Sequence, residues 1–198
     1  MPSLPFWPFA AAALCLTAGA QTRTESPAIA YVEGDVTVDE QPLQRPASLS
    51  ESSTIRTAGG RVEVRLRGGV RVALGPNIAL RVMDNRPYSF DRLEMIGGTA
   101  VVTTGAGSAS MLCEDAIKLP EGGVFHFDLR PISHGPYGEN DCRFRVYHGA
   151  ATVQLATMTT VLTAGKTMGL NRRCGDMIPW QKFDLAEVDE LYRWAAKR

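Results

Sequence analysis

The feature that most constrains the fold is a run of alternating residues from Arg61 to Val82, RVEVRLRGGVRVALGPNIALRV. Apolar and charged side chains alternate in three short segments, which are separated by turns at Gly68-Gly69 and Gly75–Asn77. Alternation with a period of two places apolar side chains on one face of a β-strand and charges on the other. Because three short strands with one apolar face are not stable alone, the run predicts a larger sheet.

A glycine-centred quasi-repeat extends this prediction over the chain. An apolar pair, one further residue, a glycine and an alternating segment occur at Tyr31–Val38, Met95–Val102 and Val146–Val153. Each copy is followed by a second unit that ends in glycine, at Ile55–Gly59, Ile117–Gly122 and Val161–Gly165. Recurrent glycine in a strand is typical of a bulge or a sharp corner. The pattern predicts an all-β domain of wrapped or stacked antiparallel sheet, as a β-roll, a short solenoid or a jelly-roll-like sandwich.

Only the C-terminal end has a helical pattern. We expect an amphipathic helix over about residues 184–196, with Asp184 as its N-cap and Glu187 completing a capping box. Its apolar face comprises Leu185, Val188, Leu191, Tyr192 and Ala195. Trp180 and Phe183 precede the helix and are expected to pin it to the sheet. We expect the helix to close one end of the β-domain, and exposure for docking to a partner is the alternative.

Residues 1–20 have the pattern of a secretory signal peptide. An apolar run from Leu4 to Leu16 is followed by the small residues Ala18-Gly19-Ala20, so we expect cleavage before Gln21. The expected organisation is a signal peptide over 1–20, a disordered lead-in over 21–29, a β-domain over 30–172 and a C-terminal extension over 173–198. The expected location is periplasmic or secreted, and an uncleaved membrane anchor is the alternative.

Three cysteines remain after this cleavage: Cys113, Cys142 and Cys174. In an oxidising compartment an odd count allows at most one internal disulfide. Cys113 shares an alternating face with Ile117 and Leu119, which indicates a small buried hydrophobe. Cys142 and Cys174 flank the last predicted hairpin. Of the three possible pairings we therefore predict a Cys142–Cys174 disulfide.

The sequence contains no recognisable catalytic or metal-binding pattern. His126, His134 and His148 are far apart, and none has a ligand neighbour at metal-binding spacing. His126 and Asp128 share one strand face, which is more often a surface pair than a site. The segment Gly105–Ser110 lacks the third glycine and the following helix of a dinucleotide-binding loop. We expect no enzyme activity, no catalytic residue, no metal and no cofactor.

Charge is balanced over the whole chain but not along it. The 21 Lys and Arg residues equal the 21 Asp and Glu residues, which gives no general attraction to nucleic acid. Arginine is concentrated in the first predicted sheet, at Arg56, Arg61, Arg65, Arg67, Arg71, Arg81, Arg86 and Arg92. If the outward faces of these strands share a surface, Arg61, Arg65, Arg67 and Arg71 form an anionic-ligand face. Its expected partner is an envelope protein or an anionic surface polymer. The alternative is a solvated strand face that discourages edge pairing.

Residues 30 to about 170 resemble the FecR domain of bacterial envelope proteins. The resemblance is carried by YVEGDVTV, STIRTAGGRVEVRLRGGVRVALGPNIALRV, RLEMIGGTAVV, and FRVYHGAATV with VLTAGKTMGL. Founding members of that family are membrane-spanning regulators that relay a signal from an outer-membrane receptor to a cytoplasmic sigma factor. The resemblance implies an exported all-β domain with a non-catalytic binding or signal-sensing role in the cell envelope. The alternatives are a purely structural envelope protein, or a membrane-anchored regulator if residues 1–20 are retained.

Overall fold

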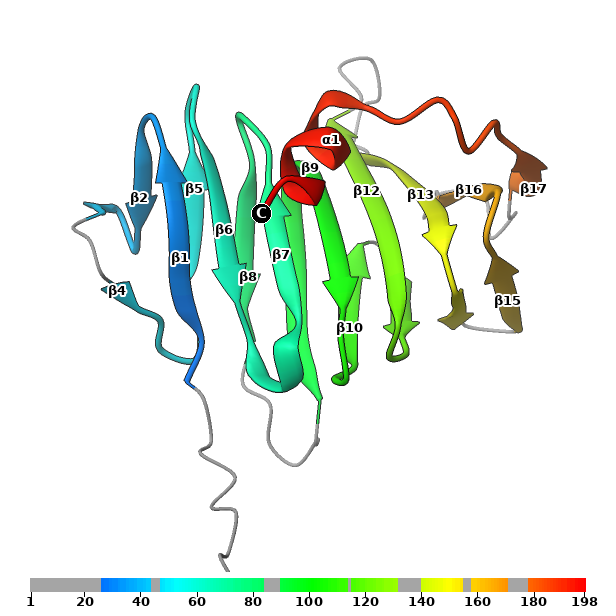
Figure 1. The fold of residues 1–198 in the computed structure, drawn as a ribbon, viewed down its shortest axis with the longest axis horizontal. Helices are drawn as coiled ribbons and strands as arrows, with labels where there is room; N and C mark the ends of the chain where they lie inside the picture. The colour runs from blue at the N-terminus through cyan, green and yellow to red at the C-terminus, as the bar shows by residue number, and fades with distance from the viewer. Residues whose placement is uncertain are drawn as a thin grey trace, which may run out of the picture.

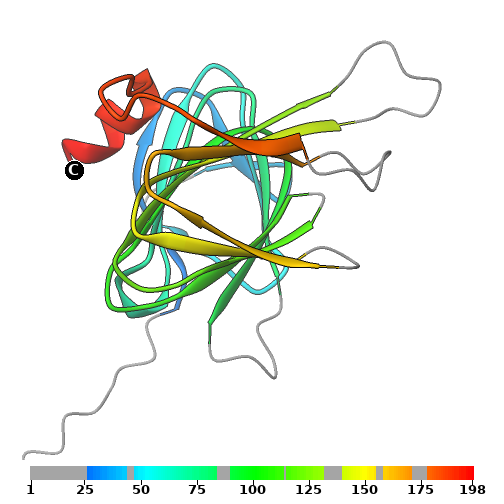
Figure 2. The same cartoon turned by 90° about the vertical axis from the view of Figure 1, so that its right-hand side faces the viewer.

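The computed structural model describes residues 26–43, 47–83, 90–113, 115–131, 140–154, 158–170 and 178–198. Over these ranges the chain forms seventeen β-strands, one short 3-10 turn and one α-helix. The strands form one continuous hydrogen-bonded sheet that wraps over into two layers, which we call sheet A and sheet B (Figures 1 and 2). The expected fold class, a wrapped all-β sheet with one C-terminal helix, is confirmed.

The two layers share the strand β9 (Asp91–Thr104) and are otherwise built from different strands. Sheet A runs in the spatial order β4 (Ala47–Ser48), β1 (Ala28–Glu33), β6 (Arg61–Arg65), β7 (Arg71–Leu74), β9, β12 (Gly123–Pro131), β13 (Asn140–His148), β16 (Lys166–Leu170) and β17 (Ile178–Lys182). Sheet B runs in the order β3 (Gln41–Pro42), β2 (Val36–Val38), β5 (Thr54–Thr57), β8 (Ala79–Val82), β9, β10 (Ala109–Cys113), β11 (Asp115–Leu119), β14 (Ala150–Gln154) and β15 (Thr159–Thr163). All of these pairs are antiparallel except β9 with β10.

Strand β9 passes from one layer to the other. Its first half, up to Gly97, pairs with β8 and β10 in sheet B. Its second half, from Gly98, pairs with β7 and β12 in sheet A. The strand changes layers at Gly98, where φ is 89°. One uninterrupted segment therefore fixes how the two layers lie relative to each other.

The quasi-repeat seen in the sequence is a repeat of corners. Gly34 lies between β1 and β2, Gly98 lies within β9, and Gly149 lies between β13 and β14; all three have positive φ. Two glycines of the second unit, Gly122 and Gly165, also have positive φ and lie where the chain returns from sheet B to sheet A. The predicted sharp corners are confirmed at these five positions.

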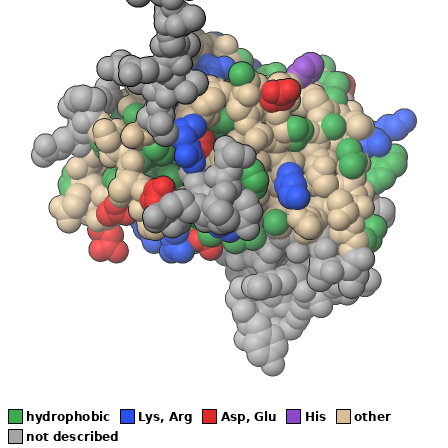
Figure 3. Space-filling view, turned by 90° about the horizontal axis from the view of Figure 1, so that it is seen from below, with side chains coloured by type: hydrophobic (Ala, Val, Ile, Leu, Met, Phe, Trp, Pro, Cys, Tyr) green, Lys and Arg blue, Asp and Glu red, His purple; other side chains and the backbone are tan. Residues whose placement is uncertain are grey.

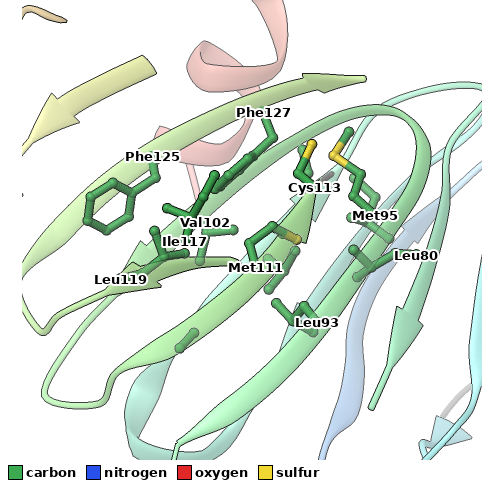
Figure 4. Close-up of a cluster of buried hydrophobic side chains, with 14 of the residues drawn as sticks. Leu80, Leu93, Met95, Val102, Met111, Cys113, Ile117, Leu119, Phe125 and Phe127 are labelled. Carbon is green, nitrogen blue, oxygen red and sulfur yellow. The ribbon is translucent and has the colours of Figure 1, made fainter. Parts of the chain in front are cut away.

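The core lies between the two layers and is filled by alternate residues of each strand. Val62, Val64 and Leu66, predicted to share an apolar face, are at most 1% exposed. Figure 4 shows side chains from β8, β9, β10, β11 and β12 meeting in this interior. The rings of Phe127 and Phe144 stack there with centroids 4.9 Å apart. Burying each large apolar side chain contributes about 1.5–3 kcal/mol, so this interior supplies the main stabilising term.

A disulfide joins the two layers through the core. It links Cys113 of β10 in sheet B to Cys142 of β13 in sheet A, with the Cα atoms 6.3 Å apart. The predicted Cys142–Cys174 pairing is therefore wrong, and Cys174 lies outside the described residues. The error has a physical reason: proximity to a hairpin in the sequence does not reveal which strands face each other across two stacked layers. The expected burial of Cys113 is confirmed.

The C-terminal helix α1 (Glu190–Ala196) begins about six residues later than expected. Asp189 is its N-cap, because its Oδ1 accepts a hydrogen bond from the Tyr192 amide at 2.7 Å. Asp184, the expected N-cap, instead accepts from the Ala186 amide at 2.9 Å and stabilises a turn. Residues between β17 and α1 therefore cross the outside of sheet A without regular structure (Figure 1). In the described part of the chain no helix is long and apolar enough to cross a membrane.

Only one of the two aromatic residues expected to pin the helix does so. Phe183 packs edge-to-face on Tyr147 of β13, with ring centroids 5.3 Å apart. Trp180 is 45% exposed and lies under the Lys166 ammonium group on the sheet edge.

Gly98→Ala should lower the free energy of unfolding by about 1–3 kcal/mol, because L-residues rarely adopt its φ. The added Cβ would also lie 2.7 Å from the Ile78 Cα. Gly97→Ala is the matched control, since a Cβ there meets nothing within 4 Å. Urea denaturation measures both, and an equal loss in the two variants would contradict the role of Gly98 as a corner.

Candidate functional site

The four arginines predicted to form an anionic-ligand face are only partly brought together. Arg61 and Arg65 of β6 and Arg71 of β7 alternate with buried valines and therefore point out of sheet A. Arg65 and Arg71 are directly opposite each other in the pairing of these strands. Arg67 lies instead in the 3-10 turn η1 (Arg67–Gly69) that joins β6 to β7.

Three of the four arginines have acidic partners. The ion pairs are Arg61–Glu190, Arg65–Glu63 at 3.4 Å and Arg67–Asp91 at 3.1 Å. Arg56 and Arg81 belong to sheet B, and Arg81 pairs with Glu94 there. Basic and acidic side chains are accordingly interspersed on the surface seen in Figure 3. The described arginines of this set are thus divided between two layers and do not form one basic platform, and Arg86 lies outside the described residues.

The most organised outer surface of the molecule lies elsewhere on sheet A, under α1. Directly opposed positions on four neighbouring strands carry Glu63, Ala73, Val101 and His126. These side chains point away from the core, yet each is at most 4% exposed. They are buried because the C-terminal segment covers them, on the outside of the two layers (Figure 2). We call Tyr31, Glu33, Arg61, Ala73, Val101 and His126 the helix-docking face.

The centre of the helix-docking face is apolar. Ala73 and Val101 pack with Leu191 and Trp194 of α1 in a cluster that is separate from the main core. Ala73 and Val101 are small, so they leave a flat strip on the sheet that admits the larger helix side chains. The C-terminal helix therefore packs against the outer face of sheet A and does not close one end of the β-domain as expected. Leu185, which was expected on the apolar face of the helix, is 47% exposed.

Polar contacts surround this apolar strip. His126 Nε2 lies 2.6 Å from Asp189 Oδ2, at the N-terminal end of α1. Trp194 Nε1 donates to Glu33 Oε2 at 3.0 Å, nearer the C-terminal end. The Arg198 guanidinium lies over the Tyr31 ring, 3.5 Å from its centroid. With the Arg61–Glu190 pair, these contacts fix both the position and the direction of the helix.

Asp189 is the electrostatic link between α1 and the sheet. Burial acts to raise the pKa of its carboxyl group. The hydrogen bond and charge of His126, the Tyr192 amide and the charge of Arg145 outweigh burial and lower that pKa below its usual value. The carboxylate therefore stays charged when the helix is docked.

Tyr147 of β13 lies beside this pair. Burial, and then the negative charge of Asp189, raise the pKa of its phenol above the usual value. The phenol is therefore protonated at neutral pH, which is the opposite of an activated nucleophile. Its ring packs against Tyr192 of α1, with centroids 4.5 Å apart. Tyr147 thus contributes to holding the helix.

The described residues contain no group of three or more His, Cys, Asp and Glu side chains placed to hold a metal ion. Beside α1, a cavity of about 10 Å³ lies among Glu63, Arg71 and Ala195 and is too small for an organic ligand. A larger, open depression of about 350 Å³ lies where the chain leaves β17, between Lys166, Lys182 and Leu185. The arrangement under α1 holds a helix against a sheet.

The helix-docking face is not evident in the sequence pattern. His126 and Asp128 were expected to form a pair, but Asp128 forms an ion pair with Arg130 at 2.6 Å, whereas His126 contacts Asp189. Both His126 and Asp128 are less than 9% exposed, so they are not the expected surface pair. The available signal was that Ala73 and Val101 are apolar although they alternate with core residues, because an outward strand position exposed to water usually carries a polar side chain.

No family model matches this chain, and no curated protein matches it. It is similar to two crystal structures of a "putative anti-sigma factor" from Parabacteroides distasonis ATCC 8503. The 2.50 Å structure gives a TM-score of 0.51 at 15% identity, covering 77% of this chain and 62% of that chain. The 1.65 Å structure gives 0.53 at 16%, covering 72% and 64%. The present chain thus spans less than two thirds of either protein, and the likeness shows a shared fold.

Asp189→Asn should reduce the loss of stability in acid. Because the folded-state pKa of Asp189 lies below its unfolded value, its contribution is present above the usual carboxyl range and is lost as the pH falls through the folded pKa. Asn can still cap the helix but cannot carry charge. Urea denaturation between about pH 7 and about pH 3 should show a flatter profile for this variant.

Asp184→Asn is the matched control for this experiment, because Asp184 is exposed and also accepts a backbone amide. Its pH profile should follow that of the wild type. If Asp189→Asn also follows the wild type, Asp189 does not link α1 to the sheet through its charge.

Proposed function

We propose that this chain is an exported, FecR-like domain that acts as a non-catalytic binding or signal-sensing module of the bacterial cell envelope. The observation that carries the proposal is the wrapped two-layer fold, shared with structures described as anti-sigma factors. The segments that resemble FecR coincide with the corners of this fold. YVEGDVTV covers the corner between β1 and β2, and FRVYHGAATV covers the corner between β13 and β14.

The disulfide supports the export part of the proposal. Disulfides persist in oxidising compartments and are rare in the reducing cytosol. Cys113–Cys142 is fully buried between the layers, where it acts as a structural cross-link. A chain with the signal-like residues 1–20 and a structural disulfide is best suited to the periplasm or the extracellular space.

A protein partner fits the geometry better than an anionic polymer does. Three of the four candidate arginines already contact an acidic group, whereas the helix-docking face binds a protein helix through apolar and polar contacts. One observation still favours an anionic ligand. Arg65 is 64% exposed and lies directly opposite Arg71, and Glu63, 3.4 Å from Arg65, balances only one of these two like charges.

Export is tested by expressing the full chain in a bacterium with an oxidising periplasm, followed by fractionation, intact-mass analysis and peptide mapping without reduction. The expected product lies in the soluble envelope fraction, begins at Gln21 and contains a Cys113–Cys142 cross-link. A cytoplasmic product with free thiols would overturn the proposal. A membrane-bound product that keeps residues 1–20 would replace it with the anchored-regulator alternative.

The anionic-ligand candidate is tested by retention of the folded protein on an anionic polymer resin. The double variant Arg65→Ala/Arg71→Ala should elute at lower salt than the wild type, because two positive charges of the candidate face are gone. Arg56→Ala/Arg81→Ala, which removes the same charge from sheet B, is the matched control and should elute with the wild type. Absence of wild-type retention at low salt would exclude an anionic polymer and leave the protein partner.

A further inference from the structure

The helix α1 is an addition to a β-domain that is already complete. The main core contains no residue of the described segment 178–198. The buried apolar side chains of the helix belong to a separate small cluster on the outside of sheet A. It is joined to β17 by residues 183–189, which have no regular structure. The helix can therefore leave the sheet without opening the core between the two layers.

The docked helix is not stable by itself. It has seven residues, and isolated helices shorter than about 12–15 residues are marginal in water. Only Leu191 and Trp194 are buried on its apolar face. Glu190, the partner of Arg61, has a side chain that is 76% exposed, so water screens this pair. The segment thus folds as it binds, which makes it replaceable by a competitor that binds the same surface.

The helix-docking face specifies the chemistry of an occupant. Arg61 and His126 are the groups that meet acidic residues at the N-terminal end of the helix. Ala73 and Val101 receive the apolar side chains in the middle. Glu33 accepts the indole N–H of Trp194. A helix with acids first, then leucine, then tryptophan fits in one direction only.

We propose that the helix-docking face is a protein-interaction site, which α1 occupies in cis and from which a partner helix displaces it. The partner carries a short amphipathic helix of the same chemistry, with two acidic residues at its start followed by leucine and tryptophan on one face. In this chain these positions are the N-cap Asp189 and, within α1, Glu190, Leu191 and Trp194. This inference rests on the binding role proposed above and assigns that role a location.

Displacement also changes what the molecule exposes. Release of α1 uncovers His126, Ala73 and Val101, which are at most 4% exposed while the helix is docked. It also frees the C-terminal segment from Tyr31 and Glu33. The partner-bound and free states therefore differ in the mobility of the last residues of the chain. Binding of a partner can be detected through that change in mobility.

The test uses a labelled peptide with the sequence of residues 184–198, DLAEVDELYRWAAKR, and the full-length chain. Trp194→Ala in the chain removes the main apolar contact of the cis helix and its hydrogen bond to Glu33. Fluorescence anisotropy should show that this variant binds the peptide at least about tenfold more tightly than the wild type, whose own helix competes at high effective concentration. A peptide with Trp194→Ala is the matched control and should bind neither chain.

Leu191→Ala provides a second chain with a weakened helix, in case the Trp194→Ala chain does not fold. Circular dichroism checks that each variant keeps the β-sheet spectrum of the wild type. Absence of peptide binding to either folded variant overturns the proposal. Equal binding to wild type and variants also overturns it, because the peptide would then bind elsewhere.

A further substitution locates the bound peptide. His126→Ala, added to whichever of the two variants binds the peptide, should abolish that binding, because His126 belongs to the helix-docking face. Failure of the export experiment would leave these outcomes unchanged.

Discussion

The structure depends on one constraint: a single strand, β9, has to belong to both layers. Its two halves pair with different neighbours, and the change occurs at Gly98, whose φ of 89° is accessible to few other residues. The apolar faces of the two layers are buried only when the layers lie against each other in a fixed relative position. Because β9 fixes that position, this crossing determines which side chains meet in the core. The Cys113–Cys142 disulfide then ties β10 to β13 across the same interior.

The outside of sheet A has a different character from the core. Its centre is covered by a helix whose packing cluster is independent of the main core, and its contacts are a mixture of small apolar groups and polar pairs. Such a surface is stable when covered and still compatible with exchange, because uncovering it does not disturb the interior. The fold therefore separates the interior that gives stability from the surface that we propose as an interaction site.

Much of the fold could be predicted from local patterns. The alternation in Arg61–Val82 predicted the strands correctly, and the spaced glycines predicted the corners correctly. Both succeed because the pleat of a strand and the backbone angle φ depend on only a few adjacent residues. The disulfide partner and the helix start could not be predicted. Cys113 and Cys142 are 29 residues apart and meet only because sheets A and B stack. Asp184 and Asp189 are both residues that can cap a helix. Which of them begins α1 depends on where the helix-docking face lies on sheet A.

The sequence by itself determined that this chain is an all-β domain with glycine corners and a C-terminal helix, because strand periodicity and backbone conformation are local. Only the tertiary structure decided which charges are available. It divided the arginines between two layers, paired Arg61 with Glu190 of α1, and placed His126 against Asp189. These contacts join residues more than sixty positions apart, so their energy depends on burial and proximity that only the folded chain creates.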